Sequence, residues 1–181
     1  MKQLLCALLM FPCIASALEL PATDGKNYDT AAAGDKKAIV LFFVSPFCST
    51  TKSFMKEINQ IAADYSEKAV VYLVHSDPEI TNEVAMEHAI LSEVKATVLL
   101  DKQQALAKQV QAKITPEAVV LSPKSETLYK GRINDLYLGP TKRQRAATTK
   151  DLRDALDAII AGKPVPSPQH EAQGCKIGGM K

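Results

Sequence analysis

The sequence lacks several residue types and charge patterns on which specialised functions depend. Its 181 residues include no tryptophan and only three histidines, and the formal net charge is only +2. A charge this small argues against a nucleic-acid partner, because such proteins usually carry a strongly basic face. His75, His88 and His170 have no spacing typical of zinc ligands, so no metal is expected and the first two are interpreted as structural residues.

The sequence also lacks an apolar run long enough to span a bilayer. The N-terminal apolar stretch, residues 4–17, contains Pro12 and is shorter than the ~20 residues of a transmembrane helix. It follows a lysine and ends in Ala-Ser-Ala, the small residues that signal peptidase recognises. Residues 1–17 are therefore predicted to be a secretory signal peptide, and we expect a periplasmic or secreted protein without a membrane anchor.

Cysteine is scarce, with four residues in the whole chain. Removal of the signal peptide leaves Cys48 and Cys175, and in an oxidising compartment such a pair can form a disulfide. The bond would be either a structural staple or a redox pair that opens and closes during turnover. The spacing of the two cysteines does not decide between these roles.

Hydrophobic patterning predicts a single α/β domain. Buried strands are predicted at residues 38–45, 69–76, 96–101, 114–122 and 126–133. Amphipathic helices are predicted at 50–65, at 77–90 with its start at Asp77-Pro78-Glu79, at 102–112, and at 150–162 with Thr149 as cap. This order predicts a thioredoxin-like fold, a central mixed sheet flanked by helices, with an extra strand and helix before the final hairpin.

The end of the chain has a different composition from the predicted domain, residues 18–163. Residues 164–181 contain three closely spaced prolines and carry Cys175. Proline-rich segments run extended, so this tail is predicted to cross the surface without forming a further element.

Cys48 lies where a buried strand ends and a helix begins. The unpaired N–H groups of a helix start favour a thiolate over a thiol, and the thiolate is the nucleophile. Ser45 and Thr51, together with Ser49 and Thr50, offer hydroxyls that either hydrogen-bond the sulfur or cap the helix. The alternative is an inert, buried cysteine.

Two further positions are candidates for the site. Thr115-Pro116 precedes a buried strand, and in thioredoxin-like folds a cis proline at this position packs beside the active cysteine. A trans proline that opens a strand is the alternative. Arg132 offers a guanidinium that can hold a thiolate or an oxyanion, although surface exposure is the simpler interpretation.

The stretches FFVSPFCSTTKSFMKEINQIAADY, ITPEAVVLSPKSETLYKGRINDLY and DLRDALDAIIAGKPVPSPQHEAQGCKI resemble the exported redoxin family, the peroxiredoxin-like branch of the thioredoxin superfamily that includes the alkyl hydroperoxide reductase and thiol-specific antioxidant proteins. The resemblance covers essentially the whole mature chain. It implies a thioredoxin fold and thiol redox chemistry, with Cys48 at the attacking position and Pro116 as the cis proline.

The chain departs from the motifs of this superfamily in three places. Thr51 occupies the position of the second cysteine of CxxC. In the peroxiredoxin pattern PxxxTxxC, Ser45 replaces the threonine and Leu41 the proline. Lys52 occupies the position of the second cysteine of the copper-binding CxxxC relatives, which argues against a copper site.

Two functions remain open on the sequence. In the first, Cys48 attacks a peroxide or a disulfide, and Cys175 or an external thiol completes the cycle without metal or organic cofactor. In the second, the chain is a non-catalytic binding module in which a Cys48–Cys175 disulfide is structural. The missing CxxC favours the second, and the position of Cys48 favours the first.

Overall fold

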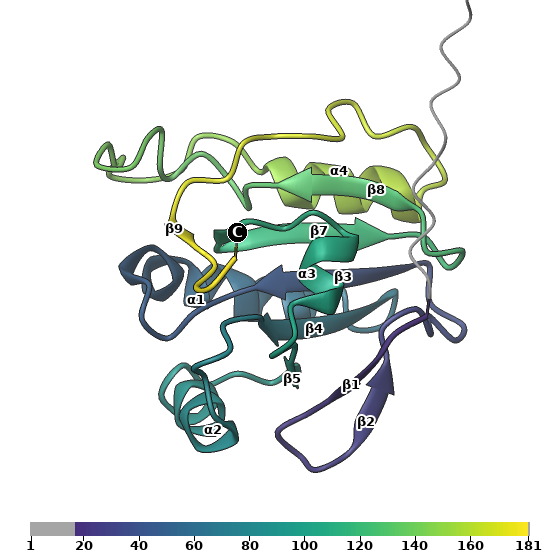
Figure 1. Ribbon diagram of the computed structural model, residues 1–181. Helices are drawn as coiled ribbons and strands as arrows, with labels where there is room; N and C mark the ends of the chain where they lie inside the picture. The colour runs from purple at the N-terminus through teal and green to yellow at the C-terminus, as the bar shows by residue number, and fades with distance from the viewer. Residues whose placement is uncertain (1–16, 181) are drawn as a thin grey trace, which may run out of the picture.

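The computed structural model describes residues 17–180, and the predicted signal peptide, residues 1–17, lies outside that range except for its last residue. Five strands form a central sheet in the order β5-β4-β3-β7-β8 (Figure 1). Their bounds are Thr97–Leu100 (β5), Ala69–His75 (β4), Ala38–Phe43 (β3), Glu117–Leu121 (β7) and Thr127–Gly131 (β8). β3, β4 and β5 are parallel, whereas β7 is antiparallel to both β3 and β8. The predicted mixed α/β sheet with its final hairpin is confirmed.

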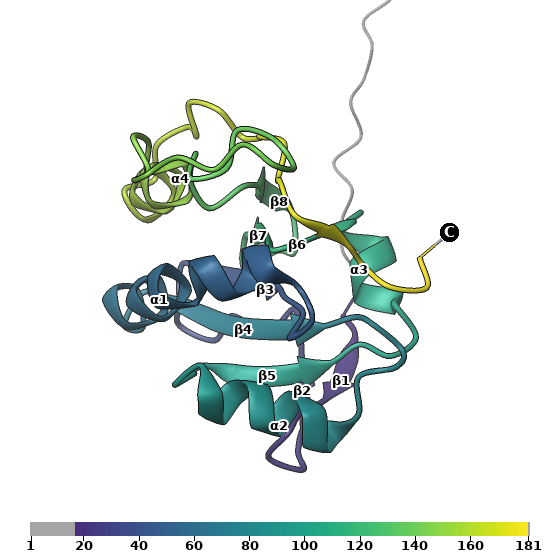
Figure 2. The ribbon, with the colours of Figure 1, turned by 90° about the vertical axis from the view of Figure 1, so that its left-hand side faces the viewer.

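Four helices cover the two faces of this sheet. They are α1 (Ser49–Asp64), α2 (Asn82–Leu91), α3 (Ala105–Gln109) and α4 (Asp151–Ile160). α1 and α4 lie on one face and α3 lies on the other, as the side view shows (Figure 2). No helix within residues 17–180 is both long enough and apolar enough to cross a membrane.

Two hydrophobic clusters pack against the two faces of the sheet, and β3 contributes to both. All of its residues are buried. Val40 and Phe42 point into the cluster shared with α1, α2 and α4. Ile39, Leu41 and Phe43 point into the opposite cluster, which includes residues of α3. A strand covered on both faces needs a continuous apolar run, and this explains the pattern in the sequence.

Two predicted helix starts are wrong. α2 begins at Asn82, where the Thr81 hydroxyl accepts a hydrogen bond from the Val84 N–H at 3.3 Å. Asp77 instead forms a turn, in which its carboxylate accepts the Glu79 N–H at 3.0 Å. At α4 the cap residue is Lys150, which makes no side-chain cap, so Thr149 is not the cap.

The C-terminal tail forms an element that the sequence did not predict. Cys175–Lys176 (β9) pairs antiparallel with Ile114–Thr115 (β6), directly before Pro116. The expectation of a tail without further structure is therefore wrong, because the backbone edge of β6 was available for a partner strand. A second addition is the hairpin of Glu19–Pro21 (β1) and Asn27–Asp29 (β2) at the start of the described chain.

Candidate functional site

Cys48 is positioned by the short loop between β3 and α1. It is the N-cap residue of α1, and its backbone carbonyl accepts the Lys52 N–H at 3.1 Å. Its own N–H donates to the Ser45 carbonyl at 3.2 Å. The first turn of α1 carries no acidic residue, so no carboxylate offsets the partial positive charge of the helix start.

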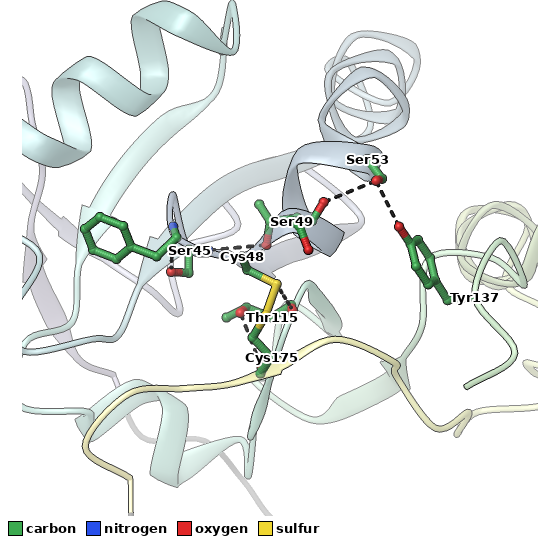
Figure 3. Close-up of a disulfide and its surroundings, with 9 residues drawn as sticks. Ser45, Cys48, Ser49, Ser53, Thr115, Tyr137 and Cys175 are labelled. Atoms are coloured by element: carbon green, nitrogen blue, oxygen red, sulfur yellow. Dashed lines mark hydrogen bonds between the residues drawn. A yellow bond between two sulfur atoms is a disulfide. The ribbon is translucent and has the colours of Figure 1, made fainter. Parts of the chain in front are cut away.

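Cys48 and Cys175 form a disulfide, with their Cα atoms 5.9 Å apart (Figure 3). Cys48 is only 2% exposed, whereas Cys175 is exposed on the tail. The structure therefore brings together the two cysteines that are 127 positions apart in the sequence. Of the two bonded residues, Cys175 is thus the one that solvent reaches.

Thr115 contacts both cysteines from the β6 side. The Cys48 sulfur lies 3.1 Å from the Thr115 carbonyl oxygen, and the Thr115 hydroxyl donates to the Cys175 carbonyl at 3.3 Å (Figure 3). The Thr115–Pro116 peptide bond is cis, as predicted. The disulfide, the helix start and the cis proline thus form one compact site.

Ser45 and Thr51 organise the loop around Cys48. The Ser45 hydroxyl accepts the Phe47 N–H at 3.3 Å, and the Thr51 hydroxyl accepts the Ser45 N–H at 3.4 Å. Neither hydroxyl hydrogen-bonds the Cys48 sulfur in the described structure, so their role here is to shape the backbone. Thr51 is fully buried and holds the loop from within, whereas Ser45 is half-buried.

Arg132 is engaged by a carboxylate. Its Nε and Nη2 donate to the two carboxylate oxygens of Asp151 at 3.0 and 3.2 Å. Burial raises the pKa of the Asp151 carboxyl, but hydrogen bonds from Arg132 and Thr149 outweigh it and hold that pKa below its usual value. The guanidinium therefore joins β8 to α4, and its charge is already paired.

We expect Arg132→Ala to act on stability more than on Cys48. The substitution removes both guanidinium hydrogen bonds from the Asp151 carboxylate, whose side chain is 8% exposed and which keeps only Thr149 and His170 beside it, and should lower the free energy of unfolding by about 1–3 kcal/mol. Urea unfolding measures this loss. The rate of alkylation of reduced Cys48 should change less than twofold, and a tenfold fall would instead place Arg132 in the thiol chemistry.

Three residues that the sequence interpretation did not single out support the site. Glu117 accepts the Lys113 N–H at 2.8 Å and thereby holds the segment that leads to Pro116. Phe47, the residue before Cys48, is an apolar side chain that is 72% exposed. Gln104 donates to the Gly178 carbonyl at 2.6 Å and so fastens the tail. Of these three residues, only Glu117 could have been found from the sequence, because it immediately follows the predicted cis proline.

The described residues offer no clear place for a metal ion. Within residues 17–180 no group of three or more His, Cys, Asp or Glu side chains is placed to hold one.

The fold is shared with solved structures of both uncharacterised and redox proteins. A conserved protein of Geobacillus kaustophilus is 25% identical with a TM-score of 0.81, over 92% of this chain and 90% of its own. A hypothetical protein of Sinorhizobium meliloti 1021 is also 25% identical, with a TM-score of 0.82 over 94% and 95% of the two chains. A secreted disulfide oxidoreductase of Mycobacterium tuberculosis, 16% identical over 81% of this chain and 96% of its own, has a TM-score of 0.55 and supports the fold alone.

The sequence comparisons identify the family. No curated protein matches the chain. The profile of the AhpC/TSA family matches residues 13–130, more than half of the chain. The matched segment includes Cys48 and Pro116 but ends before the tail that carries Cys175. The chain therefore belongs to the AhpC/TSA family.

Proposed function

We propose that the protein is an exported thiol–disulfide oxidoreductase whose exchanging bond is Cys48–Cys175. One observation carries this proposal. A cysteine at the start of α1 is bonded to an exposed cysteine, against the backbone of Thr115 and the cis proline Pro116. In the net reaction the reduced protein gives two electrons and two protons to a substrate disulfide and becomes the intramolecular disulfide.

Cys48 is the attacking group of the reduced protein. The helix start stabilises its thiolate, which attacks one sulfur of the substrate disulfide and displaces the other as a thiolate. The product is a mixed disulfide between Cys48 and the substrate. Phe47, the exposed apolar residue next to Cys48 in the sequence, offers a surface to the substrate.

Cys175 completes the exchange. Its thiolate attacks the Cys48 sulfur of the mixed disulfide, which releases the second substrate thiol and forms Cys48–Cys175. The residue at the CxxC position, Thr51, has no thiol, so the tail supplies the resolving group from 127 positions away. A distant cysteine held by the fold thus takes the place of a local one.

An external dithiol would return the protein to its reduced form. Attack at the exposed Cys175 makes Cys48 the leaving group, and the thiolate that is better stabilised leaves faster. The reductant is oxidised to its own disulfide, so the electrons balance. The compartment we propose, periplasmic or secreted, is one in which such exchange occurs.

A peroxidase, and hence antioxidant, function would use the same cysteines. Cys48 would become a sulfenic acid as the peroxide is reduced, and Cys175 would then close the disulfide with loss of water. Disulfide exchange is the function better supported, because the guanidinium of Arg132, the cation considered for holding an oxyanion, is paired with both carboxylate oxygens of Asp151.

The proposal is tested by trapping the mixed disulfide. The Cys175→Ser variant, reduced and then mixed with a peptide disulfide, should accumulate peptide covalently bound to Cys48, because no resolving thiol is present. Mass spectrometry of the digested protein locates the adduct. Cys48→Ser is the matched control and should form no adduct under the same conditions.

The structural-staple alternative gives the opposite result. A reduced Cys175→Ser protein that forms no adduct with peptide disulfides, and whose Cys48 also resists peroxide, would be the binding module with a permanent disulfide. Peroxide treatment of the same variant, followed by trapping of a sulfenic acid, distinguishes a peroxidase from a disulfide exchanger.

A further inference from the structure

The C-terminal tail lies on the backbone edge that directly precedes the cis proline. Thr115 is opposite Cys175 and Ile114 is opposite Lys176 in an antiparallel pair. The Ile177 N–H extends this pairing by donating to the Lys113 carbonyl at 2.9 Å. Figure 2 shows β9 running beside β6 in front of α3. An edge strand pairs with one partner at a time, so no other strand can use this edge while the tail is docked.

The tail approaches β6 so closely that only glycine fits immediately before Cys175. A Cβ atom on Gly174 would overlap the carbonyl oxygen of Thr115. The backbone angle of Gly174 is not in the left-handed region, so the requirement is for space and not for conformational freedom. The docked tail is therefore sensitive to a single added methyl group.

Contacts on both sides of Cys175 hold the tail without help from the disulfide. Upstream, the His170 N–H donates to the Lys130 carbonyl at 3.1 Å. Downstream, Ile177 is only 4% exposed and packs in the core cluster on the α3 side of the sheet. None of these contacts involves sulfur, so reduction of the disulfide does not remove either partner of any of them.

Between its contacts the tail borders a cavity instead of packing flush against the domain. The cavity has a volume of about 930 Å³, with one wall formed by residues 109–111, 113, 114 and 117 and by Thr127 and Lys130 of β8, and the other by residues 169–172, 176, 177 and 180 of the tail. A segment fastened at separate points over a cavity can be displaced by breaking a few contacts. We call residues 169–177 the strap, because this part of the tail is held at separate points and carries Cys175 to Cys48.

We propose that residues 174–177 are a built-in competitor for the substrate strand. The proposal rests on the function proposed above and names its substrate class, an extended cysteine-containing segment of a protein. Such a segment replaces the tail on β6, and its disulfide is attacked by the Cys48 thiolate, which releases one substrate thiol. When the tail docks again, Cys175 attacks the Cys48 sulfur and releases the second thiol.

Gly174→Ala tests the strap in the full-length chain. The reduced protein is mixed with a probe, the disulfide-linked dimer of the peptide HEAQGCKIG, which corresponds to residues 170–178. With its own tail pushed off β6, the variant should form the Cys48–peptide disulfide about tenfold faster than the wild type, because the tail no longer competes at high effective concentration. The adduct should also accumulate in the variant, since Cys175 resolves it slowly.

Gly139→Ala is the matched control. A Cβ at Gly139 would meet its nearest neighbour, Lys142, at an ordinary 3.9 Å, so this variant should react as the wild type does. Ile177→Ala weakens a different contact of the tail, the packing of Ile177 in the core cluster, and should also react faster than the wild type. This second variant tests the proposal even if the Gly174→Ala protein folds poorly. Thermal unfolding reports whether each variant is folded.

The outcomes separate the strap from the function on which it rests. Equal rates for the wild type, Gly174→Ala and Ile177→Ala, all forming adducts, would overturn the strap and leave the oxidoreductase intact. If reduced wild type and variants all fail to react with the probe, and with glutathione disulfide, the proposed function fails and the proposed competition by the tail fails with it.

Discussion

Reduction of the Cys48–Cys175 disulfide is expected to lower the free energy of unfolding by about 4 kcal/mol. The bond closes a loop between residues 127 positions apart, and a cross-link over so long a loop removes much of the conformational entropy of the unfolded chain. Urea unfolding of the oxidised and the reduced protein, at equal pH, measures the difference. Since linkage is reciprocal, folding should favour the disulfide over two free thiols by the same amount.

Cys175→Ser is the control for this measurement. Cys175 is exposed, so the serine adds little beyond the loss of the bond, and its stability should match that of the reduced wild type within about 1 kcal/mol. Adding reductant to the variant should change nothing. A reduced wild type as stable as the oxidised protein would mean that the unfolded chain is not constrained by this bond.

A second large effect is expected when the pH is lowered: the free energy of unfolding should fall because His75 is buried. Its Nδ1 lies 3.1 Å from the Val44 carbonyl oxygen, which only accepts, so this nitrogen carries the proton of the neutral ring. Its Nε2 lies 3.4 Å from Nδ1 of His88. Burial, and secondarily the nearby His88, lower the pKa of His75 from 6.5 to about 3.

This lowered pKa makes the fold less stable as the pH falls. Between pH 6.5 and about 3 the unfolded chain binds a proton at His75 that the folded protein does not, so stability is present above the unfolded pKa and is lost below it. We expect a loss of about 2 kcal/mol between pH 6.5 and about pH 4.5. Chemical denaturation at a series of pH values measures how steeply the free energy of unfolding depends on pH.

His75→Asn provides the matched comparison. The asparagine amide keeps a donor toward the Val44 carbonyl but does not titrate, so the loss of stability over this pH range should fall to less than half. If the free energy of unfolding depended on pH equally steeply in wild type and variant, the acid sensitivity would come from other groups. Unfolding at about pH 7.5 shows whether the variant retains the fold.

Local patterns predicted the elements that need no distant partner. The apolar run of β3 and the amphipathic repeat of α1 placed Cys48 at a strand–helix boundary, whereas the cis state of Thr115–Pro116 was expected from the likeness to thioredoxin-like folds. Helix starts were harder, because Asp77 and Thr81 both have the chemistry of a cap. Only the packed structure makes Thr81 the residue whose hydroxyl meets a free N–H.

By itself the sequence determined the order of the central strands and the helices, the family, and the place of Cys48 at a strand–helix boundary, because periodicity and short motifs are properties of neighbouring residues. The tertiary structure alone decided that Cys175 is bonded to Cys48, that Arg132 is paired with Asp151, and that the tail forms a strand on β6. Each of these is a contact between residues far apart along the chain. Such contacts depend on which edges and charges the packed fold leaves available.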